Sequence, residues 1–160
     1  MLSPTPIFRG ESIRWMEGIY GMRKDGLPVG SRSKTVFFQL ANFEEKLNGF
    51  SGHIPKSIMA HIMRFQIAWC ASRHDGDLPS GYCAEQDKEE VDGPYQLYQI
   101  RVGPNHGYRA WIMFLDESSE AYWVHIFKKV KDRQPEDMDR ARVLARRHWN
   151  KIRRGRNATG

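Results

Sequence analysis

The sequence predicts an α+β fold, in which helices pack on one face of an antiparallel sheet and leave the other face open. Strand-like and helix-like segments follow one another in the order β-α-α-β-β-β-α along 160 residues. Short, turn-like connectors join the last three strands, which favours an antiparallel meander. A hydrophobic content of 40% and an aromatic content of 12% are sufficient for one packed core.

The first predicted elements are a strand and two helices. Residues 1–32 are interrupted by proline and glycine, and we interpret them as an N-terminal extension with a short helix over residues 11–22. Residues 35–40 have the β-branched and aromatic composition of a strand. A short helix over residues 42–50, capped by its first residue, and a longer buried helix over residues 55–72 are expected to follow.

A polar loop is expected next, over residues 73–94, and then the meander and a last helix. The three strands of the meander are predicted over residues 95–102, 108–114 and 121–129. Pro135 suits the first position of a helix, and an apolar stripe continues to about residue 152. Residues 153–160 form a basic tail without a pattern.

Alternation along these strands predicts which side chains reach the open face of the sheet. Guanidinium groups bind phosphate in a bidentate manner and indole rings stack on bases, so basic and aromatic side chains interleaved on a sheet favour single-stranded RNA. Two alternatives remain: a sheet that alternates core residues with solvated ones, or tryptophans covered by the N-terminal extension. The side chains assigned to the open face are Gln99, Arg101, Arg109, Trp111, Trp123, His125 and Lys129.

The charge of the chain agrees with a polyanionic partner. The formal net charge is +6 and the pI is about 9.5, which suits nucleic acid, an anionic membrane or an acidic protein, or simply an ordinary basic protein. Cys70 and Cys83 form no CxxC pair and no zinc-ligand cluster, so we expect reduced thiols and no metal. The start has no apolar signal core and no run is long enough for a membrane span, so a cytoplasmic protein is expected.

The last predicted helix carries an arginine-rich face that has two interpretations. It could contact ribosomal RNA, or it could be a solvated face balanced by the acids of the first turn. We favour RNA because the acids are confined to that turn. The arginines of this face are Arg140, Arg142, Arg146, Arg147 and Arg153.

Several short motifs, in this order, resemble the RelE/ParE toxin superfamily and most of all its HigB-like, phage-associated branch. They are Tyr98-Gln99-Ile100-Arg101-Val102, Gly107-Tyr108-Arg109-Ala110-Trp111 and His125-Ile126-Phe127-Lys128-Lys129, followed by Pro135 and an Ala/Arg-rich helix. The resemblance covers about residues 33–152, which are assigned as a toxin domain. It implies a compact, microbial-RNase-like fold.

The resemblance implies a toxin of a type II toxin–antitoxin system. Many members are mRNA interferases that cut mRNA in the ribosomal A site, and a helix-turn-helix antitoxin is the expected inhibitor. We therefore expect a ribosome-dependent endoribonuclease that inhibits translation, with mRNA, ribosomal RNA and an antitoxin as partners. It would act by attack of the 2′-hydroxyl without metal or cofactor. The alternatives are a ParE-like, non-enzymatic inhibitor of DNA gyrase, and a phage or mobile-element binding protein of the same fold.

The resemblance also assigns residues. Arg101 and Arg109 match the basic residues of the first hairpin, while Lys128, Lys129 and Lys131 match the basic cluster that ends the last strand. In nuclease members these groups position the scissile phosphate and stabilise its developing charge. The expected catalytic set is Arg101, Arg109, His125 and Lys129, and the expected RNA-binding set is Gln99, His106, Trp111, Trp123, Lys128, Lys131, Arg133, Arg140, Arg146 and Arg147.

The acid/base group has several candidates in the sequence. His125 is the natural candidate because imidazole titrates near neutral pH, although a lone histidine on a strand is more often structural. Residues 130–137 lack the tyrosine or histidine that several nuclease members carry there. Asp132, Glu136 or Asp137 could act as the base instead, or simply cap the last helix.

Overall fold

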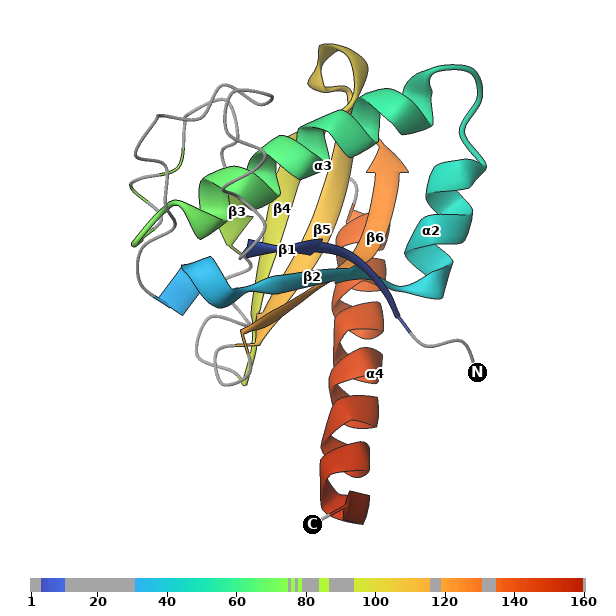
Figure 1. Ribbon diagram of the computed structural model, residues 1–160. Helices are drawn as coiled ribbons and strands as arrows, with labels where there is room; N and C mark the ends of the chain where they lie inside the picture. Colours follow the sequence, from blue (N-terminus) through green and yellow to red (C-terminus); the bar gives the residue numbers. More distant parts are fainter. Residues whose placement is uncertain are drawn as a thin grey trace.

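The computed structural model of the protein describes residues 4–10, 31–74, 76, 78, 84–86, 94–115, 119–130 and 135–159. Six strands, three α-helices and two short 3₁₀ turns lie within these ranges, so the α+β class is confirmed (Figure 1). In chain order they are β1 (Thr5–Arg9), η2 (Ser31–Lys34), β2 (Val36–Gln39), α2 (Ala41–Asn48), α3 (Ile54–Cys70), β3 (Ala84–Gln86), β4 (Gln96–Val102), η5 (Pro104–His106), β5 (Tyr108–Leu115), β6 (Glu120–Lys128) and α4 (Pro135–Thr159).

The sheet is mixed rather than purely antiparallel. Its strand order is β1-β2-β6-β5-β4-β3, and β2 pairs parallel to β6, whereas the other pairs are antiparallel. The meander β4-β5-β6 is therefore confirmed, and the antiparallel pairing expected for the first core strand is wrong. The physical reason is that two helices separate β2 from the meander, and a long helical crossover permits parallel pairing. Strands β1 and β3, which the sequence did not predict, extend the two edges.

Helices cover both faces of the sheet, so the expected open face is wrong (Figure 1). On one face α2 and α3 bury Phe43, Leu47, Ile58, Ile62 and Phe65 among the side chains of β4, β5 and β6. On the other face Ala141, Leu144 and Ala145 of α4 pack on Leu97, Trp111, Met113 and Val124. The apolar stripe of α4 needs an apolar surface, and the side of the sheet away from α2 and α3 provides one.

A β-bulge in β6 interrupts the alternation of side chains. Trp111 lies opposite His125, but Ile112 lies opposite Trp123, so Val124 is an extra residue in β6. A bulge of this kind shifts every later side chain to the other face relative to strict alternation. As a result Trp123 and Ile126 belong to the same core, beneath α2 and α3, although they are three positions apart.

The bulge is held by Asn42, the expected N-cap of α2. The residue in the N-cap position is Leu40, which makes no side-chain capping hydrogen bond, so that expectation is wrong. The Asn42 amide instead donates to the backbone oxygen of Val124 at 2.9 Å. A bulge leaves part of the strand ladder unpaired, and this side chain supplies a partner for the bulged residue.

The ends of the chain differ in part from expectation. Helix α4 continues to Thr159, through most of the segment that was expected to be a tail, because no proline or run of glycines stops it. Phe8 of β1 is buried in the core beneath α3, so part of segment 1–32 contributes to the sheet. The helix expected over residues 11–22, Cys83, and the side chains of Lys131, Asp132 and Arg133 lie outside the described residues. None of the helices in the described part is long and apolar enough to cross a membrane.

Candidate nucleic-acid interface

Two neighbouring cross-strand rows bring most of the predicted catalytic residues together. In one row across β4, β5 and β6, Arg101 lies opposite Arg109, and Arg109 lies opposite Phe127. In the next row on the same face, Gln99 lies opposite Trp111, and Trp111 lies opposite His125. Residues paired across strands share a face, and Trp111 and Phe127 belong to the core beneath α4. Both rows therefore face the α4 side, near the hairpin that joins β4 to β5.

That hairpin is built tightly, which fixes the positions of Arg101 and Arg109. Gly103 has a φ of 81°, and a Cβ atom there would lie 2.7 Å from Cδ2 of Tyr108, so a glycine is required. The backbone N–H of Lys129 donates to the oxygen of Gly107 at 2.8 Å and ties the end of β6 to the same hairpin.

Arg109 is largely buried and holds the backbone of the hairpin. The residue is 8% exposed. Its Nη1 donates to the backbone oxygens of His106 at 2.7 Å and Tyr108 at 3.1 Å. Arg101, directly opposite, is exposed. Arg101 is the accessible cation of the two, and Arg109 is a positioning residue.

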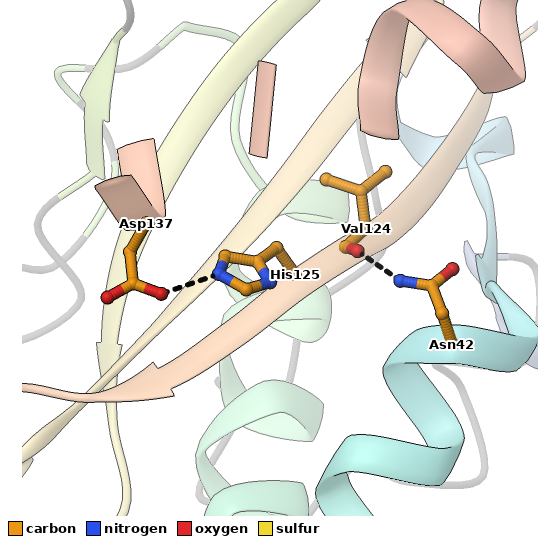
Figure 2. A network of polar contacts seen from close by, with 4 residues as sticks. All are labelled: Asn42, Val124, His125 and Asp137. Carbon is orange, nitrogen blue, oxygen red and sulfur yellow. Dashed lines mark hydrogen bonds and ion pairs between the residues drawn. The ribbon is translucent and has the colours of Figure 1, made fainter. Parts of the chain in front are cut away.

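His125 and Asp137 form a polar pair between β6 and the first turn of α4 (Figure 2). His125 Nε2 lies 3.0 Å from Asp137 Oδ1, and His125 is only 4% exposed. A carboxylate oxygen can only accept, so Nε2 carries the proton and donates it, which leaves a lone pair on Nδ1 of the neutral ring. Asp137 thereby fixes the tautomer and the orientation of the imidazole.

Burial keeps the His125 ring neutral. Desolvation is the largest cause that lowers the pKa of His125, and the nearby charges of Lys46 and Arg140 lower it further. The hydrogen bond to Asp137 and its negative charge raise the pKa, but the net change is downward. A neutral imidazole with one oriented proton can accept a second proton at Nδ1, as a general base does.

The two tryptophans of the predicted RNA-binding set are core residues, so these assignments are wrong. Trp111 is 2% exposed beneath α4, and Trp123 is fully buried beneath α3. The Trp123 indole Nε1 donates to Gln66 Oε1 at 2.9 Å, which satisfies its only polar atom. Neither ring is available to stack on a base, because α4 and the α2–α3 pair cover the two faces on which they lie.

Most of the other residues of the predicted RNA-binding set that the structure describes are exposed. His106, Lys128 and Lys129 are exposed at the hairpin end of the sheet, and Gln99 is half-buried. On α4, Arg140, Arg146, Arg147 and Arg153 are exposed, whereas Arg142 is half-buried and pairs with Asp139 at 3.2 Å. Exposed positive charge thus occurs both at the hairpin end of the sheet and along α4. Such a distribution suits a polyanion that spans more than one phosphate.

Two contributors were missed or only weakly indicated by the sequence. Asp137 was one of three possible bases, and the structure shows that it orients His125 rather than standing alone. Asn42 was assigned to a helix cap, although it supports the bulge next to His125. One sequence signal could have indicated the His125–Asp137 pair. It is a carboxylate in the first turn of the helix that follows a strand with a histidine.

The site thus combines an oriented histidine, accessible cations and a rigid hairpin. Within the described ranges, no three His, Cys, Asp or Glu side chains come together in a way that could hold a metal ion. Comparisons of the chain with protein-family models, with curated proteins and with solved structures gave no match.

Proposed function

We propose that the protein is a toxin of the RelE/HigB type, which binds mRNA on the ribosome and cleaves it without a metal ion. The observation that carries the proposal is the row of Arg101 and Arg109 beside the row that contains His125, with Asp137 behind the imidazole. Transesterification of RNA needs a general base, cations that stabilise the charge developing on the phosphate, and a proton donor for the leaving oxygen; His125 and the basic residues are candidates for the first two. The motif resemblance and the net charge of +6 support the same function.

In the proposed reaction, the RNA 2′-oxygen attacks the adjacent phosphorus and the bond from phosphorus to the 5′-oxygen breaks. The proton of the 2′-hydroxyl passes to Nδ1 of His125, and the departing 5′-oxygen takes a proton from water or a ribosomal group. The products are a 2′,3′-cyclic phosphate and a free 5′-hydroxyl. Arg101 and Lys129 offset the charge that develops on the phosphate oxygens, while Arg109 holds the hairpin that carries Arg101.

A second candidate is a non-enzymatic inhibitor that uses the same surface to bind a protein such as gyrase. The burial of His125, at 4% exposed, favours it, because a general base must come within hydrogen-bond reach of the hydroxyl that it deprotonates. In this alternative the His125–Asp137 pair serves only to attach α4 to the sheet, and Arg101 and the lysines make the contact with the target.

The test uses exposed residues, so that folding is preserved. The gene is induced in bacteria as wild type, as Arg101→Ala/Lys129→Ala, and as a control, Lys56→Ala/Arg64→Ala, which removes two exposed cations from α3 on the other face. Growth is recorded and the 5′ ends of cellular mRNA are mapped. The proposal expects growth arrest with new, codon-phased 5′-hydroxyl ends in the wild type and the control, and neither in the site variant. Arrest with intact mRNA supports the second candidate, and the absence of arrest in the wild type contradicts both.

A further inference from the structure

A cavity of about 530 Å³ lies between α4 and the junction of β2 with α2. Its size falls within the range of small-molecule sites, which run from roughly 300 to 1,000 Å³. Its floor is apolar and includes Leu40, Leu144 and Ile152. An apolar concavity of this size is suited to the hydrophobic part of a ligand.

One face of α4 supplies three cations to this cavity. Arg140, Arg147 and Lys151 all line it and are all exposed. They are separated by seven and four positions, which places them on one side of a helix. Of the described residues that line the cavity, none is acidic, and within the described part of the chain no carboxylate pairs with Arg147 or Lys151. Three like charges around an apolar space create a positive potential that a bound anion would neutralise.

A buried polar atom in the wall of the cavity also lacks a partner. Nε2 of His148 is buried and makes no hydrogen bond within the described residues, while the ring packs on Tyr122 with 4.3 Å between the centroids. Because Nε2 is covered by its neighbours, a ligand in the cavity would lie against the ring of His148 rather than on this atom. The neutral ring can donate one proton, and burial, with Lys151 nearby, lowers the pKa of His148 to about 4.

We infer that this cavity binds a small amphipathic carboxylate: an apolar chain or ring that lies on Leu40, Leu144 and Ile152, with an anionic head held by Arg147 and Lys151 beside the ring of His148. Arg140 stands at the other end of the same side of α4 and adds to the positive potential. The site is distinct from the proposed cleavage centre, because none of the residues that hold the ligand belongs to the His125–Asp137 pair or to the hairpin, although Arg140 and Arg147 are also among the residues assigned to RNA binding. A bound carboxylate would connect α4 to the start of α2 and stabilise their packing.

The test uses octanoate as the probe and the full chain as the protein. Binding is measured by calorimetry, and the imidazole nitrogens of His148 are followed by NMR. We expect octanoate to bind at least ten-fold more tightly than 1-octanol, which has the same chain without the charge, and than acetate, which has the charge without the chain. We also expect the Nε2 resonance of His148 to shift on addition of octanoate.

Matched variants locate the site. Arg147→Gln/Lys151→Gln is expected to weaken octanoate binding by ten-fold or more, whereas Arg146→Gln/Arg153→Gln, which removes the same charge from other exposed positions on α4, is expected to leave it within two-fold. Circular dichroism establishes that both variants are folded. Equal affinity for octanoate and 1-octanol, equal loss in the two variants, or no binding by the folded wild type would each overturn the inference.

Discussion

His125 Nε2 and Asp137 Oδ1, 3.0 Å apart, connect the central part of the sheet to the first turn of the C-terminal helix. The contact lies just after the bulge at Val124, which Asn42 holds from α2 (Figure 2). Thus α2 and α4, on opposite faces of the sheet, each fix one of two consecutive residues of β6. The arrangement makes the orientation of His125 depend on both helices, and it leads to predictions for each contact.

Asp137→Asn is expected to destabilise the protein by about 1–2 kcal/mol, because a partly buried hydrogen bond to a charged group is lost or weakened. The pKa of His125 is expected to fall further below its ordinary value, since Asp137 is the group that raises it. Urea denaturation and NMR titration of His125 measure the two effects. Asp139→Asn is the matched control, because Asp139 is also in α4 and pairs with Arg142 at an exposed position. Its cost should stay below about 0.5 kcal/mol, and equal costs for the two variants would contradict the prediction.

Asn42→Ala is expected to destabilise the protein by about 1 kcal/mol, because the oxygen of Val124 loses its side-chain partner. Asn48→Ala is the control: it makes the same replacement in the same helix at an exposed position, so any gain in helix propensity is shared. The difference between the two unfolding free energies isolates the contribution of the bulge contact. A difference near zero would show that water replaces the amide without cost.

Acid is expected to destabilise the fold before the carboxylates titrate. Burial lowers the pKa values of His61, His125 and His148 in the folded protein, that of His148 from 6.5 to about 4. A lowered histidine pKa means that the unfolded chain binds protons more readily, so the stabilisation is complete above pH 6.5 and is lost as the pH falls towards 4. Melting temperatures measured between pH 8 and pH 4 should fall over this window. His148→Gln should flatten the decline, and an unchanged slope in that variant would contradict the assignment.

RNA affinity is expected to depend on salt through the exposed cations. The double variant Arg101→Ala/Lys129→Ala removes two phosphate contacts in the proposed complex. For single-stranded RNA the slope of log affinity against log salt should therefore become shallower by about 1.4, at about 0.7 per contact. Fluorescence anisotropy with a labelled oligonucleotide, repeated at several salt concentrations, measures the slope. Trp111 and Trp123 are buried, so neither ring is expected to stack on a base when RNA binds.

The sequence was sufficient to identify the central strands and the three helices, because each has a local signal, whereas the edge strands β1 and β3 were missed. The helical spacing of Ile58, Ile62 and Phe65 predicted α3, and Pro135 marked the start of α4 correctly. The order of strands in the sheet was not accessible in this way, since the pairing of β2 with β6 depends on how the chain returns after two helices. The second helical layer was missed for a related reason: strand alternation identifies two faces but does not state what covers each.

The candidate site was predicted in part. Arg101, Arg109 and His125 do lie in adjacent rows, because residues at equivalent places in a regular hairpin meet across it. Trp123 was assigned to the wrong face because strict alternation was expected along the whole of residues 121–129. The bulge at Val124 then changes the face of every residue after it, and no glycine or other residue of unusual conformation marks it in the sequence.

The extra residue at Val124 has a consequence for comparing this chain with others. A relative that lacked the bulge would need a one-residue gap in the middle of its last strand before His125 and Phe127 could be matched to their counterparts. Without that gap, an alignment that matched Tyr122 and Trp123 would place every later residue one position out of frame, including the two lysines. Val124, whose backbone oxygen accepts from the Asn42 amide, is therefore the position at which an insertion or deletion in β6 should first be sought.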